Sequence, residues 1–209
     1  APPSPGYPYP KEQKMFNVDD KFTFIFSHNE AEENKFIREV KFIENRFSTR
    51  DEFVDGLLNF YNGPFQLIKP SAIDNPKIII RCETSEDIID ITNRLKKRGE
   101  NVIAVHERFS DFDDDQMAQK VPNPEEHNET FWVHQHKLVE GIDDPNFCLL
   151  ALYSPFRNAR ALVQQVGRVI RNPTRVDNQT AYVYCHPAHR QQGYWKGYRK
   201  YEEIYNQNP

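Results

Sequence analysis

Cysteine is scarce in this chain. Only three cysteines stand among its 209 residues, and Cys82, Cys148 and Cys185 lie far apart in the sequence. They form no Cys-x-x-Cys pair and no closely spaced set, so the sequence predicts no disulfide framework. Scattered thiols of this kind favour burial in a reducing compartment. We therefore expect an intracellular protein, in the cytoplasm, or in the nucleus if its source is eukaryotic.

Long apolar runs are also lacking. No stretch approaches the roughly 20 apolar residues that a membrane-spanning helix needs. The proline-rich start carries neither the basic nor the apolar region of a signal peptide. Apolar residues nevertheless make up 38% of the chain and aromatic residues 13%, which is enough for a sizeable core. The composition predicts an α/β domain with an appendage, and no membrane partner.

Metal-ligand spacing is a third absence. The carboxylates of Asp113-Asp114-Asp115 match no calcium-binding loop. His127, His134, His136 and the group Cys185-His186-x-x-His189 lack a second ligand pair at a spacing suited to zinc. We therefore expect no metal ion to be held by this chain, and we interpret these histidines as ordinary polar residues.

Basic residues are slightly fewer than acidic ones, which gives a net charge of −4, and the basic residues are unevenly distributed along the chain. Residues 154–200 hold nine Arg or Lys against one acidic residue, whereas residues 107–129 hold eight acidic residues against two bases. A basic C-terminal region beside an acidic insert indicates an anionic partner for the former. For the insert, either an interaction or plain solubility explains the charges.

One helix is predicted between Ser154-Pro155, which suit an N-cap and a first turn, and Pro173, which lies just past its far end. At 100° per residue the helix has an apolar face made of Ala159, Leu162, Val163, Val166, Val169 and Ile170. Its opposite face has Arg160, Gln164, Arg168 and Arg171, joined by Arg157 if the helix starts at Pro155. Guanidinium groups on one stripe suit phosphate oxygens, although a solvated basic face gives the same pattern.

From residue 77 onward the sequence alternates between apolar strands and amphipathic helices. Thr84 with Asp87 predicts the capped start of a helix that runs to Arg98 and is closed by Gly99. Strands are expected over residues 78–82, 102–106, 130–134, 147–153 and 180–184. This alternation predicts an α/β domain with a mostly parallel sheet.

The N-terminal third has a different character. Residues 1–13 are rich in proline and predict an extended linker. Residues 14–70 predict a strand and helical extension: a strand over 21–27, helical spacing of apolar residues over 30–47, and a helix capped by Ser48 or Thr49 that ends near Tyr61. We expect the α/β domain itself to occupy residues 71–209.

Two segments resemble known motifs. Gln164-x-x-Gly167-Arg168-x-x-Arg171 is similar to motif VI of superfamily-two DEAD/DEAH-like helicases and translocases, and residues 139–145, VEGIDDP, are similar to motif V. The apolar strand between the two also matches that family. The strand and capped helix from residue 78 resemble the start of its second, C-terminal RecA-like domain, with the motif IV loop at Thr84 and Ser85.

The resemblance implies a RecA-like, doubly wound sheet with helices on both faces. It also implies ATP with Mg²⁺ in a cleft shared with an N-terminal RecA-like domain, since this chain has no Gly-Lys-Thr loop. The fragment alone is then expected to be inactive. In this family pattern, the catalytic residues would be Gln164, Arg168 and Arg171, and the ATP-binding residues would be Gly141, Asp143 and Gly167.

The same resemblance implies a nucleic-acid track along Thr84, Ser85, Gln135 and His136. The family commonly has hydroxyl residues where this chain has Gln135 and His136, and both of these can replace a hydroxyl as a donor to phosphate. For Thr84, ordinary helix capping explains the residue equally well. DNA is favoured over RNA because the long form of motif VI resembles that of restriction-enzyme motor subunits.

Two other classes of function remain open from the sequence. A RecA-like module that binds nucleic acid or protein without hydrolysis would not need the full set Gln164, Arg168 and Arg171. An unrelated α/β enzyme would need its own nucleophile or acid–base pair, and none is evident. The basic, aromatic segment 190–205 either stacks on exposed bases or docks on the domain as a helix.

Overall fold

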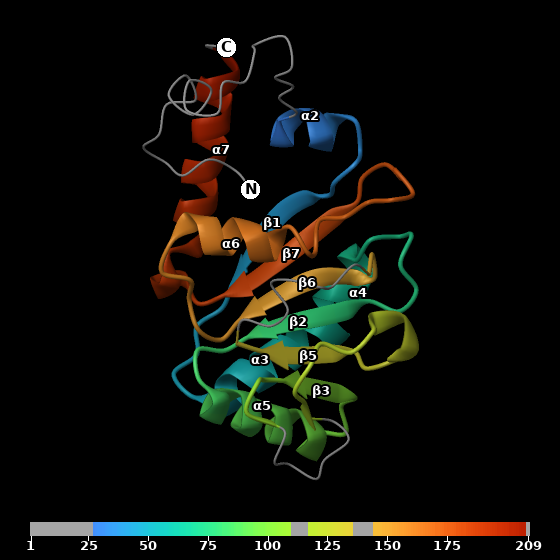
Figure 1. Ribbon diagram of the computed structural model, residues 1–209, viewed down its shortest axis with the longest axis vertical. Coiled ribbons are helices and arrows are strands. Elements are labelled where there is room, and N and C mark those ends of the chain that lie inside the picture. The colour runs from blue at the N-terminus through green and yellow to red at the C-terminus, as the bar shows by residue number, and fades with distance from the viewer. Residues whose placement is uncertain (1–26, 110–116, 136–143, 208–209) are drawn as a thin grey trace.

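The computed structural model describes residues 27–109, 117–135 and 144–207 (Figure 1). Its elements, in chain order, are α2 (His28–Glu33), β1 (Glu39–Glu44), α3 (Arg50–Asn62), α4 (Pro64–Ile68), β2 (Lys77–Arg81), α5 (Ser85–Lys97), β3 (Val102–Val105), β4 (Met117–Ala118), η3 (Pro124–Glu126), β5 (Phe131–His134), β6 (Phe147–Leu152), α6 (Ala159–Val166), β7 (Thr180–Cys185), η5 (Pro187–His189) and α7 (Gln191–Gln207).

The strands form one seven-stranded sheet in the order β1-β7-β6-β2-β5-β3-β4, and every neighbouring pair is parallel. All residues of β2, β3, β5, β6 and β7 are buried. Such continuous burial is expected when a parallel sheet is covered on both faces, because neither face meets water. The predicted α/β class with a mostly parallel sheet is confirmed.

Helices cover both faces of the sheet. One apolar core joins the sheet to α3, α4 and α5, through residues such as Phe53, Phe65 and Ile91. The other joins it to α6 and α7, through residues such as Leu162 and Trp195. In Figure 1, α6 lies in front of β7 and β6, whereas α3 and α4 lie behind the sheet. The doubly wound arrangement is therefore confirmed.

Two predicted helix caps are present. Thr49 accepts a hydrogen bond from Glu52 N–H at the start of α3, and Thr84 accepts one from Asp87 N–H at the start of α5. Gly99 follows α5 with a φ of 81°, in the left-handed region that glycine adopts without a steric cost. Local hydrogen bonds thus define the ends of these helices as the sequence indicated.

The helical pattern expected over residues 30–47 is wrong. Helix α2 ends at Glu33, and Glu39–Glu44 form β1, which pairs in parallel with β7 at the edge of the sheet. Val40 and Phe42 pack into the α6–α7 core whereas Ile43 packs into the other, so the side chains alternate as in a strand. Strand β1 thus belongs to the same sheet as the later strands, although it precedes residue 71, where the sequence analysis began the α/β domain.

The described part of the acidic insert contains two short elements. They are the 3-10 helix η3 and the two-residue strand β4, which the sequence analysis did not predict as a strand. Asp113, Asp114 and Asp115 lie outside the described residues, as do residues 1–13 and all but Ser27 of the strand expected over 21–27. Ser27 instead caps α2, where it forms a reciprocal capping box with Glu30.

Helix α7 docks on the domain and on α2. Trp195 is buried in the core, and His28 packs edge-on against Trp195 and Tyr198 with ring centroids 5.1 and 5.9 Å apart. Burial, and then the nearby Arg199 guanidinium, lower the pKa of His28 to about 4, so the ring is neutral at pH 7. Of the two interpretations of segment 190–205, docking thus accounts for Trp195 and Tyr198.

The three cysteines are free and buried. Burial raises the pKa of Cys148 and of Cys185 to about 12, so both thiols stay protonated at neutral pH. Across the described ranges, no helix combines the length and the apolar character needed to cross a membrane.

Candidate functional site

The predicted site residues fall at two opposite edges of the sheet. Thr84, Ser85 and Gln135 follow directly after β2 and β5, at the carboxyl edge, on the left in Figure 1. Helix α6 then returns from the end of β6 to the start of β7, so Arg168 and Arg171 lie at the amino edge. His136, Gly141 and Asp143 fall outside the described residues.

Motif VI is only partly helical, which corrects the predicted helix. Asn158, not Ser154, caps α6 by accepting a hydrogen bond from Ala161 N–H at 2.9 Å, while Ser154 Oγ accepts one from Glu83 N–H at 3.1 Å. The helix ends at Val166, so Arg168 and Arg171 do not continue the stripe that Arg160 and Gln164 begin. Both arginines are half-buried in the turn and strand-like segment that follow.

The chain leaves α6 at Gly167, its C-cap residue. A Cβ at this position would lie 3.2 Å from Gln164 O and 3.4 Å from Val163 O, so a side chain would crowd the end of the helix. Val169 and Ile170 then turn into the apolar core. Because these two side chains are buried, the flanking residues Arg168 and Arg171 lie further from the core, at the amino edge.

The two glutamines of motif VI differ in environment. Gln164 is exposed, whereas Gln165 is fully buried and, among the described residues, neither its Nε2 nor its Oε1 has a hydrogen-bond partner. An unsatisfied buried amide destabilises a fold by about 1–3 kcal/mol for each group. Of the pair, only Gln164 is therefore accessible to a ligand.

Motif V ends in a buried ion pair at the amino edge. Lys77 Nζ lies 2.7 Å from Asp144 Oδ2 and donates a second hydrogen bond to Pro124 O at 2.6 Å. Asp144 Oδ1 accepts from Asn146 N–H at 2.8 Å. These contacts use the Asp144 carboxylate internally. They fix the end of motif V at the start of β6.

Gln135 belongs to a chain of hydrogen bonds at the carboxyl edge. Arg108 N–H donates to His106 Nδ1 at 3.1 Å, so the neutral ring carries its proton on Nε2. That nitrogen donates to Gln135 Oε1 at 3.1 Å, and Gln135 Nε2 donates in turn to Glu83 O. The amide of Gln135 is therefore held between the ends of β2 and β3.

At the carboxyl edge, Glu83 contacts Gln135, Arg81 and Arg157. Its carboxylate pairs with the buried guanidinium of Arg81, which also donates to Pro155 O at 2.8 Å and lies 4.9 Å from the ring of Phe156. On the solvent side, Arg157 Nη2 lies 3.5 Å from Glu83 Oε1, and the Arg157 side chain is 84% exposed. Arg157 is thus a loosely held cation at the carboxyl edge.

The geometry of Thr84 fits helix capping. Its hydroxyl accepts from Asp87 N–H at 3.1 Å and donates to Asp87 Oδ2 at 2.7 Å. Asp87 is also bonded by Arg50, with Nη2 2.7 Å from Oδ1. A phosphate contact from Thr84 would require its hydroxyl proton to leave Asp87. Ser85 lies beside it on the first turn of α5 and is half-buried.

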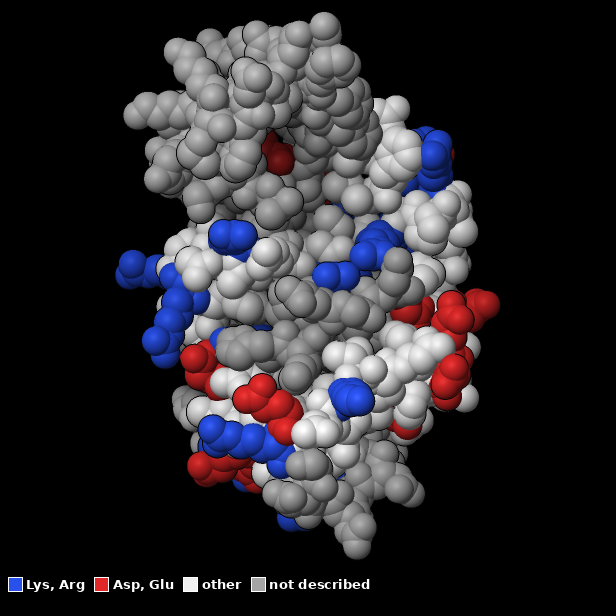
Figure 2. Space-filling view, viewed as in Figure 1, with Lys and Arg blue, Asp and Glu red and all other residues white. Residues whose placement is uncertain are grey.

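Surface charge differs between the two halves of the sheet. On the face that Figure 2 shows, blue side chains lie around α6, and red side chains lie lower in the view, level with β5 and β3, with some blue side chains among them. This division follows the sequence, in which the basic segment 154–200 includes α6 and the acidic insert 107–129 includes β4 and η3. A polyanion is therefore attracted to the α6 side of the domain.

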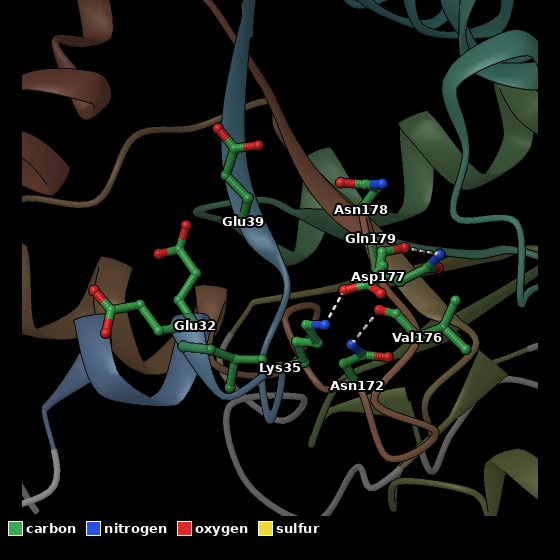
Figure 3. A pocket seen from close by; sticks show the side chains of 10 residues that line it. Glu32, Lys35, Glu39, Asn172, Val176, Asp177, Asn178 and Gln179 are labelled. Atoms are coloured by element: carbon green, nitrogen blue, oxygen red, sulfur yellow. Dashed lines mark hydrogen bonds and ion pairs between the residues drawn. The ribbon is translucent and has the colours of Figure 1, made fainter.

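A polar pocket of about 230 Å³ lies between α2, the start of β1 and the loop before β7 (Figure 3). Three of its four carboxylates have cationic partners: Asp177 pairs with Lys35, Glu39 with Lys41 at 3.1 Å, and Glu32 with Arg199 at 2.6 Å. Within the described ranges, no group of three or more His, Cys, Asp or Glu residues is arranged to hold a metal ion.

Sequence reasoning missed several residues that shape these edges. His106 and Glu83 support Gln135, and Lys77 holds the end of motif V. All three stand at the first position of a strand or within two residues of its end, where side chains of a parallel sheet converge. Their positions beside the strand ends could have been recognised in the sequence. Which strands are neighbours, however, is known only from the strand order of the structure.

A family model of the helicase conserved C-terminal domain matches residues 64–173, just over half of the chain. The chain therefore belongs to the helicase C-terminal domain family. Its all-parallel, doubly wound sheet agrees with that assignment. No curated protein sequence matches it.

Solved structures give a likeness of fold. S. cerevisiae Dbp5 L327V bound to RNA and ADP BeF3 superposes with a TM-score of 0.55 at 14% identity, over 92% of this chain and 46% of that one. The Pyrococcus furiosus Hef helicase domain gives 0.45 at 22%, over 71% and 28%. LlaBIII, an ATP-dependent Type ISP restriction-modification enzyme bound to DNA, gives 0.48 at 14%, over 79% and 13%. This chain thus spans less than half of each.

Proposed function

We propose that this chain is the C-terminal motor domain of an ATP-dependent nucleic-acid helicase or translocase. Its ATP site would be shared with an N-terminal RecA-like domain of the same protein. The observation that carries the proposal is the placement of Arg168 and Arg171 beyond the end of α6, at the amino edge. Two guanidinium groups on a short turn that the core anchors suit a phosphate held by a facing domain.

At that shared site, Arg168 and Arg171 act as arginine fingers. They stabilise the charge that develops on the transferring phosphoryl group, and Gln164 orients the attacking water. Gly141, Asp143 and Gly167 line the nucleotide side. Bound ATP with Mg²⁺ would supply the phosphoryl chemistry, and the ion would be held mainly by the N-terminal domain.

The carboxyl edge is the proposed track for nucleic acid, with DNA favoured. Ligands of open parallel sheets commonly bind beyond the carboxyl ends of the strands. Gln135 is fixed there by His106 and Glu83, and Arg157 offers an exposed cation close by. His136, Thr84 and Ser85 complete the predicted track. Motif V lies in the sequence between Gln135 at this edge and the start of β6 at the other, and it would couple the track to the ATP site.

Binding of single strands by residues 1–209 tests the track. We expect weak binding of a fluorescent 20-nucleotide DNA at 50 mM salt and about tenfold weaker binding at 200 mM, since each neutralised phosphate releases counterions. Arg157→Ala is expected to weaken binding at low salt and to reduce the salt dependence. A 20-nucleotide RNA of the same sequence tests the choice of polymer, and fluorescence anisotropy gives the dissociation constants.

The matched control is Lys41→Ala, which removes a cation from the edge strand β1. This variant is expected to bind like the parent chain. Undetectable binding at low salt would contradict the track, and so would affinity that does not change with salt. Equal losses of affinity in Arg157→Ala and Lys41→Ala would also contradict the track and would indicate nonspecific attraction of nucleic acid to basic side chains.

A further inference from the structure

Arg38 has an unusual environment for a cation. Its residue is only 3% exposed, and its guanidinium donates to three main-chain carbonyls: Nη2 to Pro145 O at 2.8 Å, and Nη1 to both Phe147 O and Val169 O at 3.0 Å. Pro145 is the last residue of motif V and Phe147 begins β6, whereas Val169 lies inside motif VI. One side chain, from outside the matched segment 64–173, thus joins the ends of both motifs.

The main chain around Arg38 holds motif VI as well. Arg38 N–H donates to Ile170 O at 2.6 Å, and Asn172 N–H donates to Phe36 O at 3.1 Å. Ile37 and Arg171 face each other in the antiparallel bridge between these two bonds. The backbone of Arg171 is therefore clamped on both sides, and the guanidinium of Arg38 fixes the preceding turn that carries Arg168.

We infer that Arg38 is a positioning residue for catalysis, one that sets Arg168 and Arg171 in register with the end of motif V. The inference rests on the proposed function, because it assigns the two arginines to the ATP site. Arg38 itself does not reach that site, since its side chain is buried. It acts through the turn at residues 167–169 and the strand-like segment at residues 170–172.

The chemistry of the site favours arginine over lysine. No carboxylate among the described residues pairs with Arg38, so its charge is balanced by carbonyl dipoles alone, and burial lowers the pKa of its guanidinium. A planar fork reaches three acceptors in fixed directions, whereas an ammonium group on a flexible stem cannot hold the same geometry. Both terminal nitrogens of the guanidinium are thus hydrogen-bonded, whereas its buried Nε has no hydrogen-bond partner among the described residues.

The test uses the motor protein, with both RecA-like domains, and the variants Arg38→Lys and Arg38→Met. Misplacement of a catalytic group by about 1 Å costs on the order of a hundredfold in rate. We therefore expect kcat for ATP to fall by about ten- to a hundredfold while KM changes little. Arg38→Met leaves no charge in the core. If the lysine variant does not fold, kcat and KM of Arg38→Met are compared with those of the parent instead.

A double-mutant cycle separates positioning from plain stability. Residues that act as a unit have non-additive effects, so Arg38→Lys in an Arg171→Lys background is expected to lower kcat by less than about twofold further. A merely structural role would give the same factor in both backgrounds. All rates are compared well below the melting temperature of each variant.

The matched control is Arg98→Lys, an arginine that joins α5 to Asp51 and Asp55 of α3 on the other face of the sheet. Its kcat is expected to be unchanged. Parental kcat in Arg38→Lys, additive losses in the cycle, or failure of both Arg38 variants to fold would overturn the inference. If Arg171→Lys alone keeps full turnover, the proposed function fails first, and the two failures are thereby distinguished.

Discussion

Arg168→Lys and Arg171→Lys are each expected to lower ATP turnover by about a thousandfold in the two-domain protein. Each guanidinium is proposed to act only where charge develops on the transferring phosphoryl group. The loss should therefore appear in kcat, with KM nearly unchanged, as for an interaction made chiefly in the transition state. Lysine keeps the charge but not the planar fork, so it does not rescue. Steady-state ATPase with and without nucleic acid measures the effect.

Folding is expected to survive both substitutions. Arg168 and Arg171 are half-buried beside the core residues Val169 and Ile170, and lysine preserves most of their length. Arg94→Lys is the control, an arginine of α5 that pairs with Asp51 and Asp90 far from motif VI. Melting curves within a few degrees of the parent are expected for all three. Parental turnover in both motif VI variants would remove the arginine-finger role and leave a basic surface.

Lys77→Met is expected to destabilise the fold by about 3–5 kcal/mol, because it leaves the Asp144 carboxylate buried without its partner. Asp144 is 4% exposed and the Lys77 side chain 10%, so water cannot replace the lost contact. For a chain of this size, the melting temperature should fall by roughly 10 °C. Thermal unfolding followed by circular dichroism measures the change.

Lys41→Met is the matched control for that substitution. The Lys41–Glu39 pair is about half exposed on both sides, and exposed ion pairs contribute within about 1 kcal/mol. The double variant Lys77→Met/Asp144→Leu should recover much of the loss, since it removes the charge left unpaired by Lys77→Met. Equal melting temperatures for Lys77→Met and Lys41→Met would contradict the assignment of this pair as the anchor of motif V.

Local signals in the sequence were sufficient for much of the fold. Thr49, Thr84 and Gly99 define helix ends through bonds and conformations that involve only near neighbours. The buried strand β6 is an unbroken apolar run, and β2 has three isoleucines between Lys77 and Arg81, as suits a sheet covered on both faces. The order of motifs V and VI around β6 was likewise visible without the structure.

Contacts between distant segments explain where the sequence analysis failed. Residues 36–44 have apolar residues at roughly helical spacing, but they pair with residues 170–172 and with β7, more than 130 positions away. The same pairing draws the chain after Gly167 out of the helix that the 3.6-residue period predicted. The role of Arg38 could not be predicted from the sequence, because its three acceptor carbonyls lie in two distant segments of the chain.

The candidate site was predictable only in part. Motif VI identified Gln164, Arg168 and Arg171 by spacing, and the structure places them near one end of α6 and in the turn beyond it. The roles of Gln135 and Thr84 at the carboxyl edge were less certain from sequence. Their hydrogen bonds to His106, Glu83 and Asp87 are set by strand order and by capping geometry.

ATP hydrolysis by residues 1–209, alone and joined to an N-terminal RecA-like domain of the same protein, tests the central claim most directly. The phosphate-binding loop that carries most nucleotide affinity in such motors has no counterpart in this sequence. We expect no turnover above background from residues 1–209 and turnover stimulated by nucleic acid from the joined protein. Robust hydrolysis by residues 1–209, or none by the joined protein, would contradict a shared ATP site.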